Sequence, residues 1–197
     1  MTPIFDNGHG GIIAGIYQTP GKRSPNWDRG VLFEGSFNRW VVNRLIEKLD
    51  RAGLTYYHAS PELTDVSLNE RVKRANEIHQ KDKKVYFISI HANAGGGVGI
   101  EGFTSPGQTR SDEICEKFLV NLKKDFEGVQ KLRSDLSDGD HDKEEKFQVL
   151  TKTNCSAILL ECGFMDNPID YEKLWSEDYL EKLVDSLFET IVELQKI

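Results

Sequence analysis

Residues 85–90, Val-Tyr-Phe-Ile-Ser-Ile, are nearly all apolar or β-favouring. A strand with one face in water alternates apolar and polar residues, whereas a strand covered on both faces stays apolar along its length. The run therefore predicts a central strand in a sheet that has helices packed on both sides. A chain built around such a strand has to supply those helices before and after it.

Segments with helical periodicity do flank this run. In residues 36–52, apolar side chains recur at every fourth position from Phe37 to Leu49, and Gly53 follows as a stop signal. Residues 67–70 (SLNE) form a capping-box pattern, which is typical of a helix start. We predict helices at residues 36–52, 68–81, 111–126 and 178–195.

Shorter β-favouring segments alternate with these helices. We predict further strands at residues 3–6, 54–58, 100–104, 147–150 and 157–161. Residues 12–33 and 133–146 lack a sustained period and are predicted to be loops. Strands that alternate with helices indicate an α/β fold, with one mostly parallel sheet and helices on both of its faces.

Length, charge and cysteine content narrow the class of protein. The 197 residues suit a single domain, which we expect to span residues 1–197. The net charge of −7 disfavours binding to nucleic-acid phosphate. No apolar stretch is long enough to cross a bilayer, so we expect no membrane insertion. The 3 cysteines are odd in number and include no CxxC pair, which argues against a disulfide framework.

The N-terminal residues 1–6 (MTPIFD) lack the basic region and the long apolar run of a signal peptide. We therefore expect synthesis in the cytoplasm without a signal peptide. The sequence leaves open the route by which the chain would reach a target outside the cell.

Four polar residues stand close to the ends of predicted elements. His9 follows the first strand in a glycine-rich turn, His91 directly follows the central strand, and Glu161 closes the last strand. Glu34 comes just before the first helix. Because function gathers at the carboxyl ends of parallel strands, we expect these groups to share one rim of the sheet. Two histidines and one carboxylate suit a catalytic zinc ion that keeps its fourth position for water.

Each of these residues also has a structural alternative. His9 can be a turn residue, and His91 can be a buried histidine whose hydrogen bonds are satisfied. Glu34 can interact with the dipole at the start of a helix. Glu161 fits such a role less well, since an acid directly after an apolar strand is rarely buried unless it is paired or functional. The residues alone leave these alternatives open.

Five segments form a recognisable series along the chain: residues 6–11 (DNGHGG), Glu34 with Asn38, residues 68–76 (LNERVKRAN), residues 89–94 (SIHANA) and residues 160–168 (LECGFMDNP). In this order they resemble the motifs of the zinc-dependent N-acetylmuramoyl-L-alanine amidases of the type 3 family, and they extend over nearly the whole chain. Residues 19–25 (TPGKRSP) are similar to a stretch in the phage-lysin branch of that family.

The resemblance implies a fold, a cofactor and a reaction. The fold would be a twisted, mostly parallel six-stranded sheet flanked by helices. His9, Glu34 and His91 would bind Zn²⁺, and Glu161 would be the catalytic glutamate. The substrate would be peptidoglycan, cut at the amide between the lactyl group of N-acetylmuramic acid and the L-alanine of the stem peptide. The resemblance leaves protein partners open.

Lys22, Arg23 and Arg71 are candidates for contacts with stem-peptide carboxylates, which the fork of an arginine matches well. The alternative for Lys22 and Arg23 is a solvent-facing loop. For Arg71 a structural salt bridge is the favoured alternative.

Two other functions would use much of the same sequence. A zinc peptidase that cuts within the stem peptide would have the same ligand set. A non-catalytic wall-binding module would lack a ligand or the base, and this sequence retains all four residues.

Overall fold

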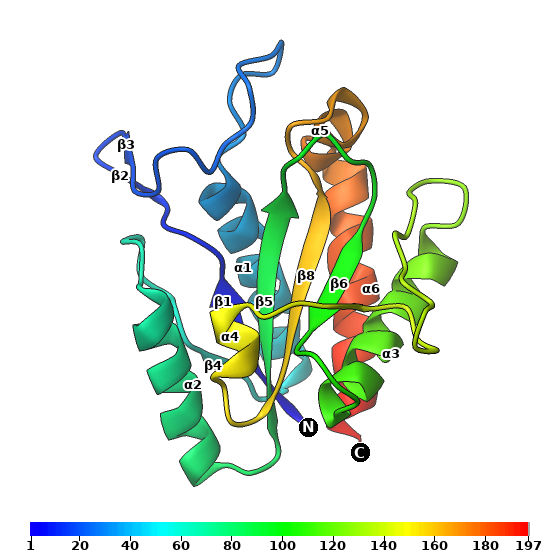
Figure 1. The fold of residues 1–197 in the computed structure, drawn as a ribbon. Coiled ribbons are helices and arrows are strands. Elements are labelled where there is room, and N and C mark those ends of the chain that lie inside the picture. Colours follow the sequence, from blue (N-terminus) through cyan, green and yellow to red (C-terminus); the bar gives the residue numbers. More distant parts are fainter. Residues whose placement is uncertain (197) are drawn as a thin grey trace.

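The computed structural model describes residues 1–196 and shows an α/β fold around a six-stranded sheet (Figure 1). The strand order is β4-β1-β5-β8-β6-β7. The strands are β1 (Thr2–Asn7), β4 (Tyr57–His58), β5 (Val85–Asn93), β6 (Glu101–Thr104), β7 (Lys143–Glu144) and β8 (Ser156–Phe164). Neighbouring strands run parallel, except that β6 and β8 pair antiparallel. The predicted fold class, a six-stranded and mostly parallel sheet, is confirmed.

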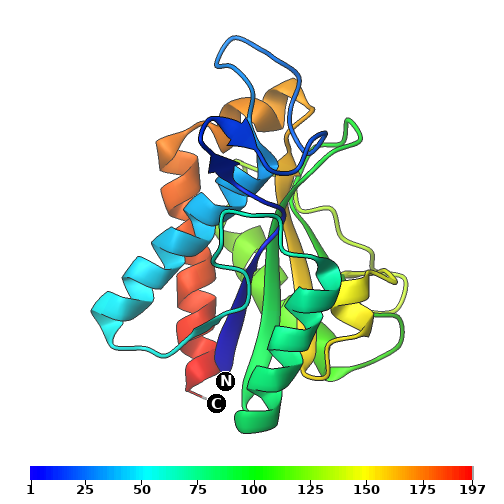
Figure 2. The ribbon, with the colours of Figure 1, turned by 90° about the vertical axis from the view of Figure 1, so that its left-hand side faces the viewer.

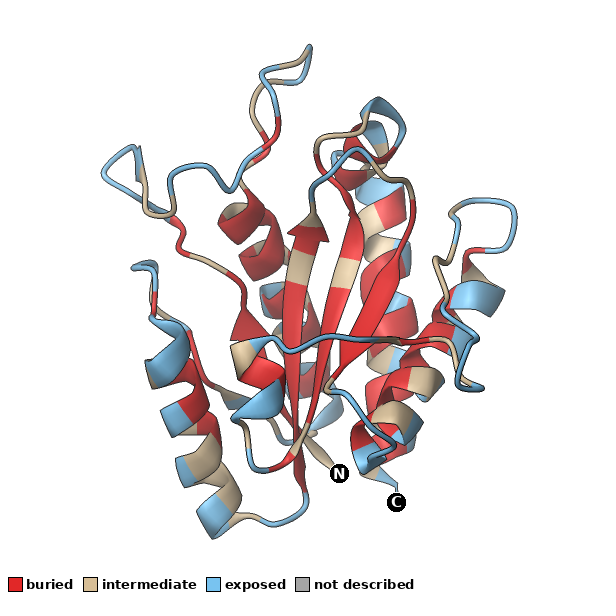
Figure 3. Ribbon diagram, in the orientation of Figure 1, coloured by how far each residue is buried: buried red, intermediate tan, exposed pale blue. Residues whose placement is uncertain are grey.

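Helices cover both faces of this sheet, as Figures 1 and 2 show from two directions. The helices are α1 (Glu34–Ala52), α2 (Leu68–Lys81), α3 (Arg110–Asp125), α4 (Gln148–Thr151), α5 (Pro168–Leu174) and α6 (Glu177–Gln195). α1, α3 and α6 pack on one face, and α2 and α4 pack on the other. Two hydrophobic cores result, one on each side of the sheet. Buried residues follow the central strands and the inner sides of the helices (Figure 3).

The central strand β5 is buried from Val85 to Ile90, as its apolar sequence predicts. Both β5 and β8 continue further than predicted, so His91 lies inside its strand and not after it, and Glu161 is not the last residue of β8. These two residues are direct neighbours across the β5–β8 pair. The extended pairing thus places an imidazole and a carboxylate side by side near the carboxyl end of the sheet.

Helix α1 begins at Glu34, two residues earlier than the apolar period predicts. Val41, Leu45 and Leu49 form its buried stripe, and each has 0% of its surface exposed. Gly53 ends the helix in the left-handed conformation, with a φ of 64°, which glycine adopts without steric penalty. Packing of α1 against β1 and β5 holds the first turn of the helix above the end of β1.

Three segments differ from the sequence predictions. Residues 147–150, predicted as a strand, belong mainly to helix α4, because a run of four apolar-rich residues is too short for periodicity to separate the two types. The loop at residues 12–33 contains a small hairpin of β2 (Ile12–Ile13) and β3 (Ile16–Tyr17). Residues 54–58 pair with the sheet only at Tyr57–His58.

Helix α5 was not predicted, although its start carries a clear local signal. The Asn167 side chain accepts a hydrogen bond from the backbone N–H of Ile169, and Pro168 occupies the first helical position. An Asn–Pro pair of this kind favours a helix start. The apolar period after it is too short to have been recognised.

The structure also bears on disulfides and on membrane-spanning helices. Cys115, Cys155 and Cys162 are free and buried, so they form no disulfide framework. Among residues 1–196, no helix has both the length and the apolar character that crossing a membrane requires.

Gly35 lies where the first turn of α1 meets the loop that follows β1. A Cβ atom at this position would come within 1.9 Å of the carbonyl oxygen of Gly10. We expect Gly35→Ala to lower the free energy of unfolding by about 1–3 kcal/mol, because backbone has to move to make room. Denaturant unfolding measures the change, with Ser36→Ala on the same helix turn as the control. Equal unfolding midpoints for the two variants would contradict this close approach.

Candidate metal centre and active site

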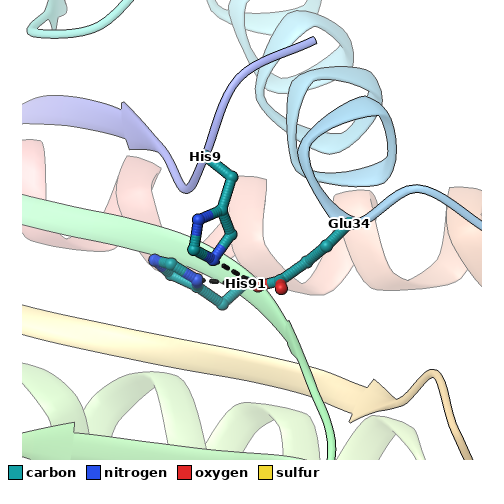
Figure 4. Close-up of side chains that lie close together, drawn as sticks. All are labelled: His9, Glu34 and His91. Carbon is teal, nitrogen blue, oxygen red and sulfur yellow. Dashed lines mark hydrogen bonds and ion pairs between the residues drawn. The ribbon is translucent and has the colours of Figure 1, made fainter. Parts of the chain in front are cut away.

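Three side chains from distant parts of the chain converge at the carboxyl edge of the sheet (Figure 4). His9 comes from the loop after β1, Glu34 from the first residue of α1, and His91 from β5. The Oε1 atom of Glu34 lies 3.2 Å from His9 Nε2 and 2.9 Å from His91 Nδ1. One ligand atom from each residue lies within 4.8 Å of the other two. Within residues 1–196, no other group of three such side chains is close enough to hold one ion.

The donor set fits a zinc ion. Two imidazole nitrogens and one carboxylate oxygen are ligands that zinc prefers, and three protein ligands leave a fourth position open. Glu34 is 2% exposed, whereas His9 and His91 are partly exposed. Burial raises the pKa of Glu34, but hydrogen bonds with His9 and His91 outweigh this effect and bring it to about 2. Glu34 is therefore an anion that faces two imidazoles.

The loop after β1 holds His9 in a conformation that few non-glycine residues adopt. Its φ is 65°, in the left-handed region. Two buried arginines stabilise this geometry: Arg39 Nη1 donates to the carbonyl oxygen of His9 at 2.9 Å, and Arg71 Nη2 donates to the same oxygen at 3.4 Å. A Cβ atom at Gly8 would lie 2.2 Å from Cε1 of His91, so the glycine lets the loop pass directly over the second ligand.

The three residues line a cleft of about 580 Å³. Glu161 lies on the same cleft, next to His91 in the sheet, and its Oε2 atom is buried without a hydrogen-bond partner. Burial raises the pKa of Glu161 to about 7, with Glu34 adding to the rise while His91 and Lys22 oppose it. A carboxyl group whose pKa is raised towards neutral pH can accept and release a proton there, as general acid–base catalysis requires.

The cleft also has apolar lining residues. They include Val66 and Leu68 around the start of α2, Phe147 and Val149 around α4, and Leu159 of β8. Leu68 and Phe147 keep 52% and 39% of their surface exposed. The cleft therefore combines the His and Glu side chains with apolar surface that a bulky substrate can contact.

The cationic candidates from the sequence have different surroundings. Lys22 lines the cleft, whereas Arg23 is exposed outside the residues that form it. Arg71 borders the cleft but is only 2% exposed, and it forms a buried salt bridge with Asp6. Its Nε also donates to the carbonyl oxygen of Val66 at 2.7 Å. The alternative that the sequence favoured for Arg71, a structural salt bridge, is present.

Sequence reasoning did not single out Asp6 and Ser89. Asp6 is 1% exposed and Ser89 is 0% exposed, and both lie behind His91. The available signal was a polar residue directly after an apolar run in each of the strands β1 and β5. Such a residue has to find a hydrogen-bond partner when it is buried, and the strand pairing decides which one.

A sequence model of the N-acetylmuramoyl-L-alanine amidase family matches residues 4–193. The chain belongs to this family. The N-acetylmuramoyl-L-alanine amidase CwlM of Bacillus licheniformis is 36% identical over 123 residues, which are 60% of this chain and 42% of that protein. The uncharacterized protein YqiI of Bacillus subtilis is 30% identical over 194 residues, which are 94% of this chain and 81% of that protein. The chain thus spans less than half the length of CwlM.

Solved amidase structures share the fold. A crystal structure of an N-acetylmuramoyl-L-alanine amidase from Clostridium difficile 630 has a TM-score of 0.78 to this chain at 23% identity. The match covers 99% of this chain and 96% of that structure. The sheet and its helical layers therefore have the fold of this amidase structure.

The convergence of His9, Glu34 and His91 predicts that the metal-free protein binds one Zn²⁺ ion per chain. We expect zinc at 100 times its dissociation constant to stabilise the fold by about 2.7 kcal/mol, since the ligand binds only the native state. Glu34→Gln should abolish this shift, because it removes the anionic ligand. Thermal unfolding with and without zinc measures the effect.

Glu116→Gln is the matched control, because Glu116 pairs with His141 at 2.8 Å outside the cleft. A zinc-dependent shift that survives in Glu34→Gln and disappears in Glu116→Gln would place the ion elsewhere.

Proposed function

We propose that the chain hydrolyses the amide between N-acetylmuramic acid and the L-alanine of the peptidoglycan stem peptide, with His9, Glu34 and His91 holding a zinc ion. The observation that carries this proposal is the convergence of these side chains in a cleft where Glu161 stands next to His91. Membership of the amidase family supports the choice of bond. We propose that residues 1–197 form one catalytic domain that acts at the cell wall.

Zinc, when bound, supplies a Lewis acid that polarises the scissile carbonyl and makes a nearby water molecule easier to deprotonate. Glu161 accepts a proton from the attacking water at its carboxylate. A C–O bond forms, the amide C–N bond breaks, and Glu161 returns the proton to the leaving amine of L-alanine. A pKa of about 7 suits both transfers, since the group has to gain and lose a proton at neutral pH.

We assign the recognition of a stem-peptide carboxylate to Lys22, because it lines the cleft close enough for its charge to act on Glu161. Arg23, the next residue of the same loop, is proposed as a second and more peripheral contact. Arg71 is left out of this role, because its guanidinium group is already bonded to Asp6 and to backbone carbonyls.

Mass spectrometry of digested peptidoglycan tests the proposed bond. We expect intact stem peptides with a free L-alanine amine to be released by the zinc-loaded protein. The release should stop when a chelator is added and return when zinc is restored, because the proposed site depends on the metal. Products cut inside the stem peptide would instead identify a peptidase, and a zinc-loaded protein that releases nothing would contradict both activities.

Glu161→Gln separates catalysis from stability. We expect kcat to fall by about 10²–10⁴-fold, the usual contribution of a general base. The folded-state pKa of about 7 lies above the usual value of 4.5, so ionising Glu161 opposes folding. This penalty is absent below about pH 4.5 and complete above about pH 7. In metal-free protein at pH 8 the variant should therefore be about 1–3 kcal/mol more stable than the wild type.

Denaturant unfolding at pH 8 and pH 4 measures the second effect, which should vanish at the lower pH. Glu189→Gln, at an exposed position on α6, is the control and should change neither quantity. Near wild-type kcat in Glu161→Gln would rule out the assigned role.

A further inference from the structure

His91 turns its second ring nitrogen away from the proposed metal site and towards a buried chain of polar groups. Its Nε2 atom lies 3.1 Å from Ser89 Oγ, and Ser89 Oγ lies 2.6 Å from Asp6 Oδ2. Ser89 and Asp6 are 0% and 1% exposed. These contacts connect β5 with β1, because Asp6 and Ser89 are partners in the parallel pairing of the two strands.

The short contact between Ser89 and Asp6 fixes which atom donates in the contact between Ser89 and His91. A serine hydroxyl has a single hydrogen to donate. The short contact with Asp6 requires that hydrogen, because a carboxylate oxygen only accepts. Ser89 Oγ then has only lone pairs to offer to His91, so Nε2 has to be the donor. Nδ1 faces Glu34 Oε1 at 2.9 Å, a contact in which a hydrogen or a metal ion has to lie between the two atoms. With a metal ion there, the neutral ring keeps its hydrogen on Nε2 and presents the lone pair of Nδ1.

The surroundings of Asp6 keep it an acceptor. Arg71 forms a buried salt bridge with Asp6 Oδ1, and Ser60 Oγ donates to the same oxygen at 2.7 Å. Both contacts favour the ionised carboxylate over the protonated acid. Asp6 thus has charged and neutral donors on Oδ1, while Oδ2 is left to the hydroxyl of Ser89.

We propose that Ser89 and Asp6 are positioning residues that fix His91 as the Nε2–H tautomer and present its Nδ1 lone pair to the metal. The inference rests on the zinc site proposed above and adds the groups that orient one of its ligands. Without them, the ring can rotate or place its hydrogen on Nδ1, and either change removes a ligand atom. Hydrogen bonds to the outer nitrogen of a ligating histidine generally strengthen metal binding by about 10–100-fold.

Ser89→Ala tests the proposal through metal affinity and does not depend on amidase activity. We expect the zinc dissociation constant, measured by competition with a chromophoric chelator, to rise by about 10–100-fold. Ser60→Ala is the matched control, because it also removes a buried hydroxyl from Asp6 but does not contact His91. That variant should lower the unfolding midpoint of the metal-free protein to a similar degree and leave zinc affinity within about twofold. Equal losses of affinity in the two variants would overturn the proposal, as would unchanged affinity in Ser89→Ala.

A second measurement tests the proposed tautomer of His91 in the wild-type protein, so it does not depend on whether Ser89→Ala folds. In zinc-loaded wild-type protein with ¹⁵N-labelled histidine, long-range ¹H–¹⁵N correlation spectra report which ring nitrogen of His91 carries hydrogen. We expect hydrogen on Nε2 and the metal on Nδ1, and the reverse assignment would overturn the proposal. These results are distinct from those expected if only the proposed amidase activity is wrong. In that case the protein would bind zinc with this tautomer and would release no stem peptide.

Discussion

The pairing of β5 with β1 on one side and with β8 on the other determines where the side chains of the site lie. All three strands run parallel, so their carboxyl halves share one edge of the sheet. The chain leaves that edge after β1 to carry His9, while His91 and Glu161 stand opposite each other in β5 and β8. A slip of one residue would turn His91 to the other face, because side chains alternate along a strand. The register that buries the apolar residues of β5 therefore also sets the spacing of the site.

The buried pair of Asp6 and Arg71 links this sheet to the loop above it. Arg71 comes from α2, and besides Asp6 it bonds the backbone carbonyls of Asn7 and Val66. Isolated charges are expensive to bury, and a buried pair adds little stability beyond repaying that cost. The pair instead holds three segments in position. The guanidinium group of Arg71 contacts the end of β1 and the segment just before α2, and it also bonds the carbonyl oxygen of His9 in the turn that carries a proposed ligand.

Sequence patterns located the parts of the fold that depend on neighbours along the chain. The apolar run of β5 and the periodic helices α1, α3 and α6 were predicted within a few residues. The convergence of His9, Glu34 and His91 depends on strand pairing, which no local spacing encodes. Their places near the ends of predicted elements indicated a shared rim of the sheet, and the ordered family motifs implied the ligand set. The pairing of Ser89 with Asp6 depends on register for the same reason. The short helix α4 was mistaken for a strand, because tertiary packing and not periodicity decides such a segment.

Glu34 and Glu161 line the same cleft, but their pKa values are shifted in opposite directions. Burial alone raises the pKa of both Glu34 and Glu161. Hydrogen bonds with two imidazoles lower the pKa of Glu34 to about 2. The Oε2 atom of Glu161 has no hydrogen-bond partner, and the pKa of Glu161 is about 7. A metal ligand has to stay ionised, while a base that returns its proton has to exchange it near neutral pH. Hydrogen-bond partners, and not residue type, thus separate the two proposed roles. Hydrogen-bond partners also determine the role of His91. In the proposed site, the contact with Ser89 keeps a hydrogen on Nε2 and leaves the lone pair of Nδ1 for the metal.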